Sequence, residues 1–382
     1  MPELQRARRE RLGPVLTALG ADAALITSPA NVRYLTGLAS SNAALLLPDA
    51  TPGDGLPGDG PPGDAESGTG PVLATDSRYA GTAREASPDL DILIERQIEP
   101  ALARVAAIRG VRRLAFEAHE MTVERYRALA GAVPGTELVA LGRAVEEIRM
   151  AKDEQEIALI ARACEITSRA FEQIVPLIRP GVTERELAIS LERAMTDLGA
   201  DGLAFDTIVA SGPNGAIPHH VPSARPFAAG DLITVDCGAR YQGYHADMTR
   251  TVVLGEPADW QRKIYALVAA AQAAGIGAAV PGADVRAVDA AARDLITEAG
   301  HGPHFQHGLG HGVGLEVHEA PIMGYGRTGT LGDRVPITVE PGIYLPGHGG
   351  VRIEDTLVVR AGTGTAAPQE LLTTTTRELL VL

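Results

Sequence analysis

Residues 233–251 read ITVDCGARYQGYHADMTRT, a pattern that predicts a β-hairpin with its turn at positions 241–243. The apolar residues before Asp236 indicate a buried strand. A turn at that place puts Asp236 roughly opposite Asp247, because both lie five or six residues from it. Most aspartates in hairpins simply face solvent, but Asp236 ends a strand that we expect to be buried. The pattern therefore predicts two carboxylates facing each other across one ladder.

A second hairpin repeats this arrangement about 100 residues later. Residues 336–344 read PITVEPGIY, a turn is expected within 347–350, and Glu340 and Glu354 are equidistant from position 347. Four acids would then approach one another from two hairpins. Unit charges about 4 Å apart repel by about 4 kcal/mol at an effective dielectric constant of about 20, so such a quartet needs protons, arginines or metal cations. Two divalent ions would cancel four carboxylates.

Several histidines lie between the two hairpins, in residues 304–321, which read HFQHGLGHGVGLEVHEAP. A single histidine is more often a surface residue or a satisfied core residue than a ligand. The glycines between these histidines let backbone and imidazoles crowd a common point, which a packed helix would not allow. His219, in the sequence GAIPHH at 215–220, precedes the first hairpin and is a further candidate.

Taken together, these motifs resemble the Xaa-Pro peptidases, aminopeptidase P and prolidase, within the methionine-aminopeptidase-like metallopeptidases. The resemblance covers nearly the whole chain and implies an α+β fold. A C-terminal catalytic domain with the pita-bread (creatinase/aminopeptidase) fold would occupy residues 144–382, after a smaller N-terminal creatinase-like α/β domain at 1–143. The family's five ligands for two metal ions coincide with Asp236, Asp247, His311, Glu340 and Glu354.

The resemblance also implies roles for other residues of the site. Glu340 would be both a ligand and the proton acceptor for the attacking water, and His318 would hydrogen-bond the developing oxyanion. His307 and His219 match histidines that line the pocket on the proline side of the bond.

Arg352 and Tyr344 match positions that orient metal ligands, although an arginine beside acids is as often a plain ion pair. One imidazole and four carboxylates suit Mn²⁺, Co²⁺ or Fe²⁺, and Zn²⁺ stays open. Mn²⁺ is the usual suggestion for the Xaa-Pro branch. We therefore expect two divalent ions, with Mn²⁺ first among them.

Two enzyme activities fit the resemblance. Aminopeptidase P removes the residue ahead of proline from longer peptides, whereas prolidase splits only dipeptides. Several prolidases carry an arginine after the His-Glu-x-Pro motif, and this chain has Ile322 there, which favours the aminopeptidase. Creatinase shares the architecture without using the metals, and the complete ligand set disfavours it. A catalytically silent binding module is the alternative from another class.

The composition limits the possible partners. The chain has 382 residues, with 34 Lys+Arg against 48 Asp+Glu and a net charge of −14, which argues against a general binder of nucleic-acid phosphates. Two cysteines, Cys164 and Cys237, cannot make a disulfide framework. No export signal or membrane span is evident, so we expect a cytoplasmic protein that acts on proline-containing peptides. The family also suggests a homodimer.

Periodicity and turn signals predict the elements on either side of the motifs. Residues 51–71, rich in Gly, Pro and Asp, should form a flexible surface insertion in the N-terminal domain. A long helix is expected from Asp153, with Glu156 completing its N-terminal cap, and a second one from Thr183 with Glu186. Further helices are expected at 258–275 and 284–299, and strands at 203–211, 231–238, 246–254, 335–344 and 350–360.

Overall fold

The computed structural model describes residues 2–49, 68–362 and 369–382. The chain divides into two compact units, Met1–Arg149 and Met150–Leu382, each described by itself below. Most of the predicted insertion, from 51 to 67, lies outside the described residues.

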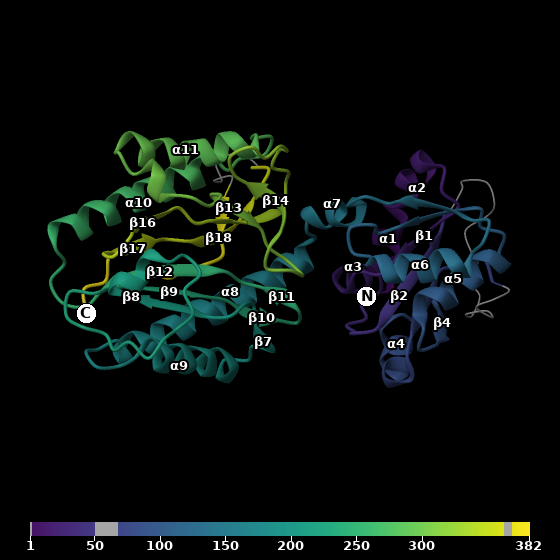
Figure 1. Ribbon diagram of the computed structural model, residues 1–382, viewed down its shortest axis with the longest axis horizontal. Helices are drawn as coiled ribbons and strands as arrows, with labels where there is room; N and C mark the ends of the chain where they lie inside the picture. The colour runs from purple at the N-terminus through teal and green to yellow at the C-terminus, as the bar shows by residue number, and fades with distance from the viewer. Residues whose placement is uncertain (1, 50–67, 363–368) are drawn as a thin grey trace. The chain divides into compact units, whose positions relative to one another are not determined.

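The N-terminal unit is an α/β structure around a mixed sheet in the strand order β4-β3-β2-β1-β5-β6 (Figure 1). Both faces of β1 are buried, and helices α5 and α6 pack with Leu102 and Leu129 on one of them. Its strands are β1 Ala23–Ile26, β2 Ala43–Pro48, β3 Val72–Thr75, β4 Asp91–Ile94, β5 Arg113–Phe116 and β6 Glu137–Ala140. Its helices are α1 Pro2–Glu10, α2 Gly13–Leu19, α3 Pro29–Thr36, η1 Ser77–Tyr79, α4 Ala80–Ala86, α5 Ile98–Ile108, α6 Val123–Ala132 and α7 Ala144–Met150.

The C-terminal unit begins with the helix predicted from Asp153. The Asp153 carboxylate accepts hydrogen bonds from the backbone N–H groups of Gln155 and Glu156, and the Glu156 side chain accepts one from the Asp153 N–H. The predicted capping box is therefore confirmed. Thr183 and Glu186 cap the second helix in the same way. The helices are α8 Glu154–Ile174, η2 Val175–Leu177, α9 Glu184–Asp197, η3 Gly212–Ala216, α10 Asp259–Ala278, α11 Val285–Glu298 and η4 Gly302–His304.

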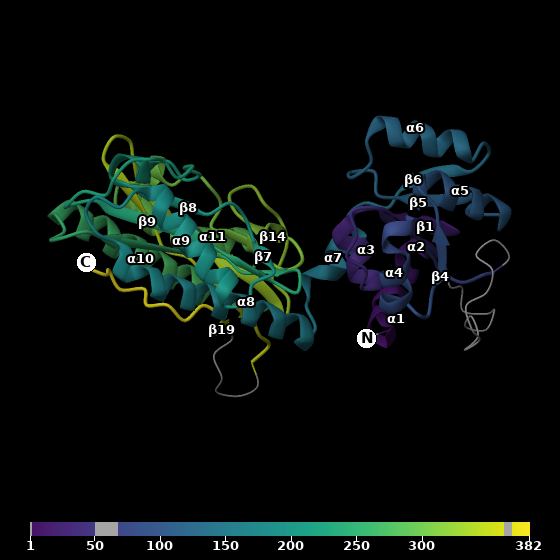
Figure 2. The same ribbon diagram turned by 90° about the horizontal axis from the view of Figure 1, so that it is seen from below.

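The strands of this unit form two similar halves, in which helices α8 and α9 cover β9 and β12, and α10 and α11 cover β15 and β18 (Figures 1 and 2). Each half buries its own apolar core, one around Phe171 and Val235 and the other around Val268 and Leu357. The strands are β7 Gly202–Leu203, β8 Ile208–Ser211, β9 Leu232–Cys237, β10 Ala239–Tyr241, β11 Tyr244–His245, β12 Met248–Val253, β13 Gly310–Gly312, β14 Glu319–Met323, β15 Val335–Val339, β16 Gly342–Leu345, β17 Gly349–Arg352, β18 Asp355–Val359 and β19 Gln369–Leu371.

The first hairpin turns at Gln242-Gly243, both with positive φ (45° and 74°), as two-residue hairpin turns require. The prediction that Asp236 lies opposite Asp247 is wrong by two residues, because pairing is symmetric about this turn and Asp236 faces Thr249. Residues two apart on a strand share a face, so Asp247 is a diagonal neighbour of Asp236 on the same side.

The second hairpin has the predicted register. Val339 pairs with Asp355, and Gly342 pairs with Arg352, so Glu340 and Glu354 occupy equivalent positions between these two pairs. Both predicted strands are interrupted at these acids, between β15 and β16 and between β17 and β18. The first hairpin is broken in the same way just before Asp247. The ladder is therefore interrupted at Asp247, Glu340 and Glu354, whereas Asp236 stays paired within β9.

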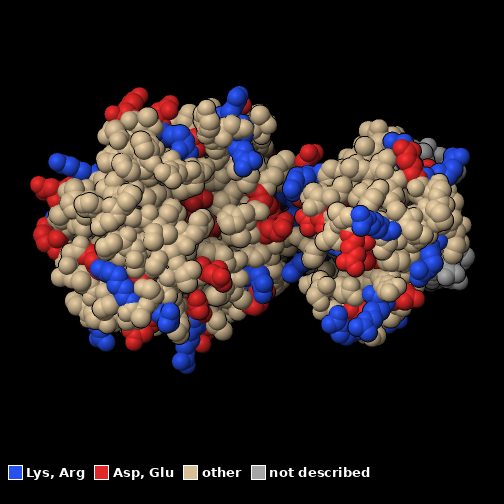
Figure 3. All heavy atoms as spheres, in the orientation of Figure 1, with Lys and Arg blue, Asp and Glu red and all other residues tan. Residues whose placement is uncertain are grey.

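On the face drawn in Figure 3, basic and acidic side chains are interspersed over both units. Within the described ranges, none of the helices combines the length and apolar character that crossing a bilayer requires.

Candidate metal centre

The structure brings together the five side chains predicted to bind metal. Asp236 comes from the end of β9, Asp247 precedes β12, His311 lies in β13, Glu340 follows β15 and Glu354 precedes β18. Within each of three overlapping groups, the donor atoms lie within 4.8 Å of one another: Asp236, Asp247 and Glu354; His311, Glu340 and Glu354; and Asp247, His311 and His318.

The tautomer of His311 leaves one ring nitrogen facing the acids. Its Nδ1 lies 3.0 Å from the Gly312 carbonyl oxygen, which can only accept, so Nδ1 carries the hydrogen. Nε2 lies 3.6 Å from Asp247 Oδ2 and 3.4 Å from Glu340 Oε1. Burial lowers the pKa of His311 to about 4, so the imidazole is neutral at neutral pH. A neutral imidazole whose second nitrogen is tied to a carbonyl is the form that binds metals.

The carboxylates repel one another in a buried place. Burial, together with the neighbouring acids, raises the pKa values of Asp247 and Glu354 well above their ordinary range. Burial also raises the pKa of Glu340 to about 8, although Arg352 opposes this shift. The protein's own cations therefore do not balance these acids.

Asp236 and Glu354 each have one carboxylate oxygen that accepts a hydrogen bond and one that has no partner among the described residues. Asp236 Oδ2 accepts a hydrogen bond from Arg352 Nη2 at 2.7 Å, and Glu354 Oε2 accepts one from Thr249 Oγ1 at 2.7 Å. The other oxygens, Asp236 Oδ1 and Glu354 Oε1, are buried and have no hydrogen-bond partner among the described residues. A buried, unpartnered carboxylate oxygen is costly unless something positive meets it. The donor set of oxygens and one imidazole thus fits divalent cations.

A hydrogen-bonded chain leads from Asp236 to the histidine pocket. Arg352 donates to Asp236 and, through Nη1, to Tyr344 Oη at 2.9 Å. The Tyr344 hydroxyl lies 2.8 Å from His307 Nε2, whose Nδ1 is 2.8 Å from the Gly308 carbonyl oxygen. The carbonyl only accepts, so Nδ1 carries the hydrogen and Tyr344 donates to Nε2. Arg352 is therefore an ion-pair partner that also links a predicted ligand to a predicted pocket residue.

A cavity of about 740 Å³ opens beside the acids. His219, His307 and His318 line it, as does Ile322, and the His318 ring centroid lies 4.4 Å from that of His311. Burial lowers the pKa of His318, which leaves it neutral at neutral pH. All of the predicted site residues line this cavity except Tyr344, which reaches it through its contact with His307.

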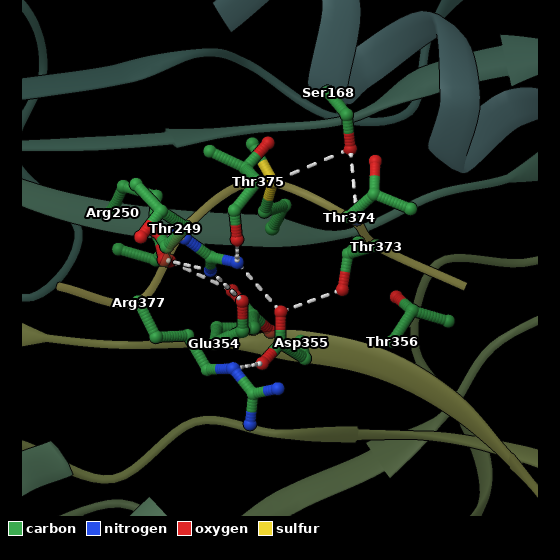
Figure 4. Close-up of polar contacts among 12 residues, drawn as sticks. Ser168, Thr249, Arg250, Glu354, Asp355, Thr356, Thr373, Thr374, Thr375 and Arg377 are labelled. Carbon is green, nitrogen blue, oxygen red and sulfur yellow. Dashed lines mark hydrogen bonds and ion pairs between the residues drawn. The ribbon is translucent and has the colours of Figure 1, made fainter. Parts of the chain in front are cut away.

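A buried ion pair between Arg250 and Asp355 contacts the backbone of Glu354 (Figure 4). Arg250 donates to Asp355 Oδ1 at 2.7 Å and to the Glu354 carbonyl oxygen at 2.5 Å. Thr373 Oγ1 also donates to Asp355 Oδ1, and Gln272 Nε2 donates to Oδ2. Arg250 and Asp355 are 2% and 1% exposed. The backbone that carries Glu354 is therefore held by charge-assisted hydrogen bonds.

Thr249 and Arg250 were not predicted as site residues, although both stand in the hairpin sequence. Thr249 could have been found from the pairing register, because it lies opposite Asp236. Arg250 carries no such signal, since its partner Asp355 is 105 residues away.

Two family models match the chain. Metallopeptidase family M24 matches residues 158–361, a range that contains all five predicted ligands, and the creatinase/prolidase N-terminal domain matches residues 8–151. The chain belongs to metallopeptidase family M24. It is thus a metallopeptidase, and the family implies divalent metal ions. The predicted architecture, a pita-bread catalytic domain after a creatinase-like domain, is confirmed.

Relatives of this M24 peptidase match it over nearly its full length. An uncharacterized peptidase of Bacillus subtilis is 37% identical over 367 residues, which are 95% of this chain and 99% of the relative. The solved Xaa-Pro dipeptidase from Bacillus anthracis is 35% identical, with a TM-score of 0.89 over 99% of this chain and 100% of the other. The X-Pro aminopeptidase from Thermotoga maritima is also 35% identical, with a TM-score of 0.84 over 98% and 99% of the two chains.

Removing divalent ions from this M24 peptidase should make its stability depend on pH. Glu340 has a pKa of about 8 when folded and 4.5 as its ordinary value, so the folded state holds a proton that the unfolded state releases. The resulting stability is present below pH 4.5 and is lost as the pH rises through 8. We expect the free energy of unfolding in chelator to fall by about 1 kcal/mol per pH unit between about pH 7 and 8.5.

Urea unfolding with chelator and with excess Mn²⁺ measures this effect. The pKa values of His307 and His311 fall from 6.5 to about 4 on burial, so these residues are neutral in both states well above pH 6.5 and do not mask it. Bound ions should remove the slope. A metal-free protein whose stability stays constant over this range would contradict the charge balance described here.

Proposed function

We propose that this chain hydrolyses the Xaa-Pro bond at the N-terminus of peptides, using two divalent ions, with Mn²⁺ as the preferred metal. Asp236, Asp247, His311, Glu340 and Glu354 would hold the ions. The observation that carries the proposal is the convergence of these five donors beside a cavity that four further histidines line. The Xaa-Pro dipeptidase and X-Pro aminopeptidase among the solved relatives support the same bond.

Bound divalent ions would supply a nucleophile at neutral pH and polarise the scissile carbonyl. The protein's own groups would handle the protons. Glu340 would accept a proton from the attacking water and return it to the leaving nitrogen. His318 is neutral and exposed in the cavity, so its ring N–H can donate to the developing oxyanion.

Proline removes the backbone N–H and fixes φ, so an enzyme that grips an extended backbone handles an Xaa-Pro bond poorly. In this chain the cavity offers an apolar surface and imidazole rings. Phe205 and Ile322 line it together with His219 and His307. This wall suits a proline ring whose carbonyl or carboxylate accepts from a histidine.

The cavity favours substrates longer than a dipeptide. Ile322 provides no positive charge for the carboxylate of a dipeptide, as the sequence suggested. The cavity continues along α9, where Arg185, Ile189 and Glu192 line one side of the helix. We expect the residues of a longer peptide that follow proline to lie along this wall. Dipeptidase activity is the alternative, supported by the names of the B. anthracis and Pyrococcus horikoshii relatives.

An assay of three peptides tests this proposal. We expect Mn²⁺-loaded enzyme to cleave Ala-Pro-Ala with a kcat/KM at least about 100-fold above that for Ala-Ala-Ala, and more efficiently than Ala-Pro. A preference for Ala-Pro would make the protein a dipeptidase. Equal cleavage of both tripeptides would contradict proline specificity, and no cleavage of any peptide would favour the silent binding module.

A further inference from the structure

The segment between β8 and β9 carries His219 but has little regular structure. After the short helix η3, residues 217–231, all within the described chain, form neither helix nor strand. Pro218, His219 and Val221 of this segment line the cavity. Backbone hydrogen bonds with residues 181–185 hold only its later part, from Ser223 to Phe227. The part that carries His219 therefore depends on side-chain contacts.

One buried carboxylate contacts the chain both before and after His219. Glu184, the first residue of α9, is fully buried at 0% exposure. Its Oε1 accepts from the Ser211 N–H at 2.8 Å, from Ser211 Oγ at 2.7 Å and from Asn214 Nδ2 at 3.0 Å. These donors precede His219 in the chain.

The second oxygen, Oε2, holds the residues that follow His219. It accepts from His220 Nε2 at 2.8 Å, from the Ser223 N–H at 3.0 Å and from Ser223 Oγ at 2.6 Å. The histidine next to His219 thus faces the carboxylate of Glu184. One oxygen of Glu184 therefore binds residues before His219, and the other binds residues after it.

The contacts depend on the negative charge. Burial alone would raise the pKa of Glu184, but the hydrogen bonds outweigh it and lower the pKa to about 2. Arg225 donates to Ser211 Oγ at 2.6 Å and pairs with Asp231, so the Ser211 hydroxyl keeps its hydrogen for Glu184. Hydrogen bonds to an ionised carboxylate are stronger than neutral ones.

Helix α9 gives the carboxylate a rigid base. Leu187 and Leu191 are fully buried in the core of this half. Arg185, which follows Glu184 in the chain, donates its backbone N–H to the Ser223 carbonyl oxygen at 3.1 Å. The same helix lines the cavity through Ile189. Any displacement of the segment relative to α9 would therefore change the cavity itself.

We propose that Glu184 is a positioning residue, which clamps the His219 segment against α9 and so fixes the wall of the cavity on the proline side. The clamp acts on the substrate of the proposed function and rests on that function for its kinetic consequence. It acts through His219 and does not itself touch substrate or metal.

Glu184→Gln tests the clamp, because an amide offers one oxygen and one donor group where two acceptors are needed. We expect the KM for Ala-Pro-Ala to rise about tenfold with kcat changed less than about threefold. His219→Ala should give a similar change, and the double variant should add little to either. Glu186→Gln is the matched control, since Glu186 lies on the same helix, is exposed and, in the part of the chain that the structure describes, has Thr183 as its side-chain partner. Its KM should be that of the unmodified enzyme.

Amide hydrogen exchange provides a readout that does not depend on activity. Exchange of residues 212–223 should accelerate in Glu184→Gln and not in Glu186→Gln. Should Glu184→Gln fail to fold, Ser223→Ala removes one donor and should raise KM about threefold with the same exchange change. Unchanged exchange and KM in a folded variant overturn the clamp. A wild-type enzyme without peptidase activity would instead refute the proposed function, and exchange would still decide the clamp.

Discussion

Asp236→Ala is expected to lower kcat/KM for Ala-Pro-Ala about 10³-fold and to reduce the bound metal from two ions per chain to one or none. Asp236 offers a buried, unpartnered oxygen to the centre, and its other oxygen is the acceptor for Arg352. Removal of this carboxylate takes away a donor and leaves the Arg352 charge facing the remaining site. Metal analysis of the purified variant and kinetics over a range of Mn²⁺ concentrations measure both effects.

Asp206→Ala is the matched control, because Asp206 lines the same cavity but belongs to none of the donor groups. It should keep the full metal content. An Asp236→Ala enzyme with an unchanged kcat at saturating Mn²⁺ would remove Asp236 from the ligand set. A wild-type stoichiometry of one ion per chain would contradict the proposed dinuclear centre.

Arg250→Met should lower the free energy of unfolding by about 3–5 kcal/mol, because removing one partner of a buried ion pair leaves the other charge uncompensated. The charge left behind would be Asp355, which is 1% exposed and would keep only the partly exposed Arg377, at 3.4 Å, as a cationic partner. The substitution also removes the donor to the Glu354 carbonyl oxygen, so metal affinity should fall as well. Urea unfolding in chelator measures the change in the free energy of unfolding without any contribution from metal binding.

Arg360→Met is the control for this substitution. Arg360 pairs with Glu154 and Glu370, which are 64% and 47% exposed, and each such surface pair contributes about 0–1 kcal/mol. If the two variants lost similar amounts of unfolding free energy, the buried Arg250 pair would contribute no more to stability than a surface pair. Asp355→Asn should resemble Arg250→Met, since it breaks the same pair from the other side.

The elements with local start signals were predicted to within a few residues. The helix expected at 284–299 spans Val285–Glu298, and both predicted capping boxes are present. A cap or a two-residue turn depends on side chains three or four positions apart, so its signal is contained in a short stretch of sequence.

The predictions fail where the chain departs from regular periodicity. The strand predicted at 335–344 is broken at Glu340, and the expected pairing of Asp236 with Asp247 is shifted by two residues. Alternation of apolar residues continues through such breaks, so the pattern cannot show them. Glu184 is a similar case, because its position at the start of α9 resembles that of any acid in a first helical turn.

The order and chemical type of the donors were determined by the sequence, since the acids stand at fixed distances from the hairpin turns centred at 242–243 and 347. Which oxygen of each acid is left free was decided only by the tertiary structure. Thr249 meets Glu354 across 105 positions, and Arg352 meets Asp236 across 116. Contacts of this range depend on how two separately cored halves pack, a property that is not encoded in any one local stretch.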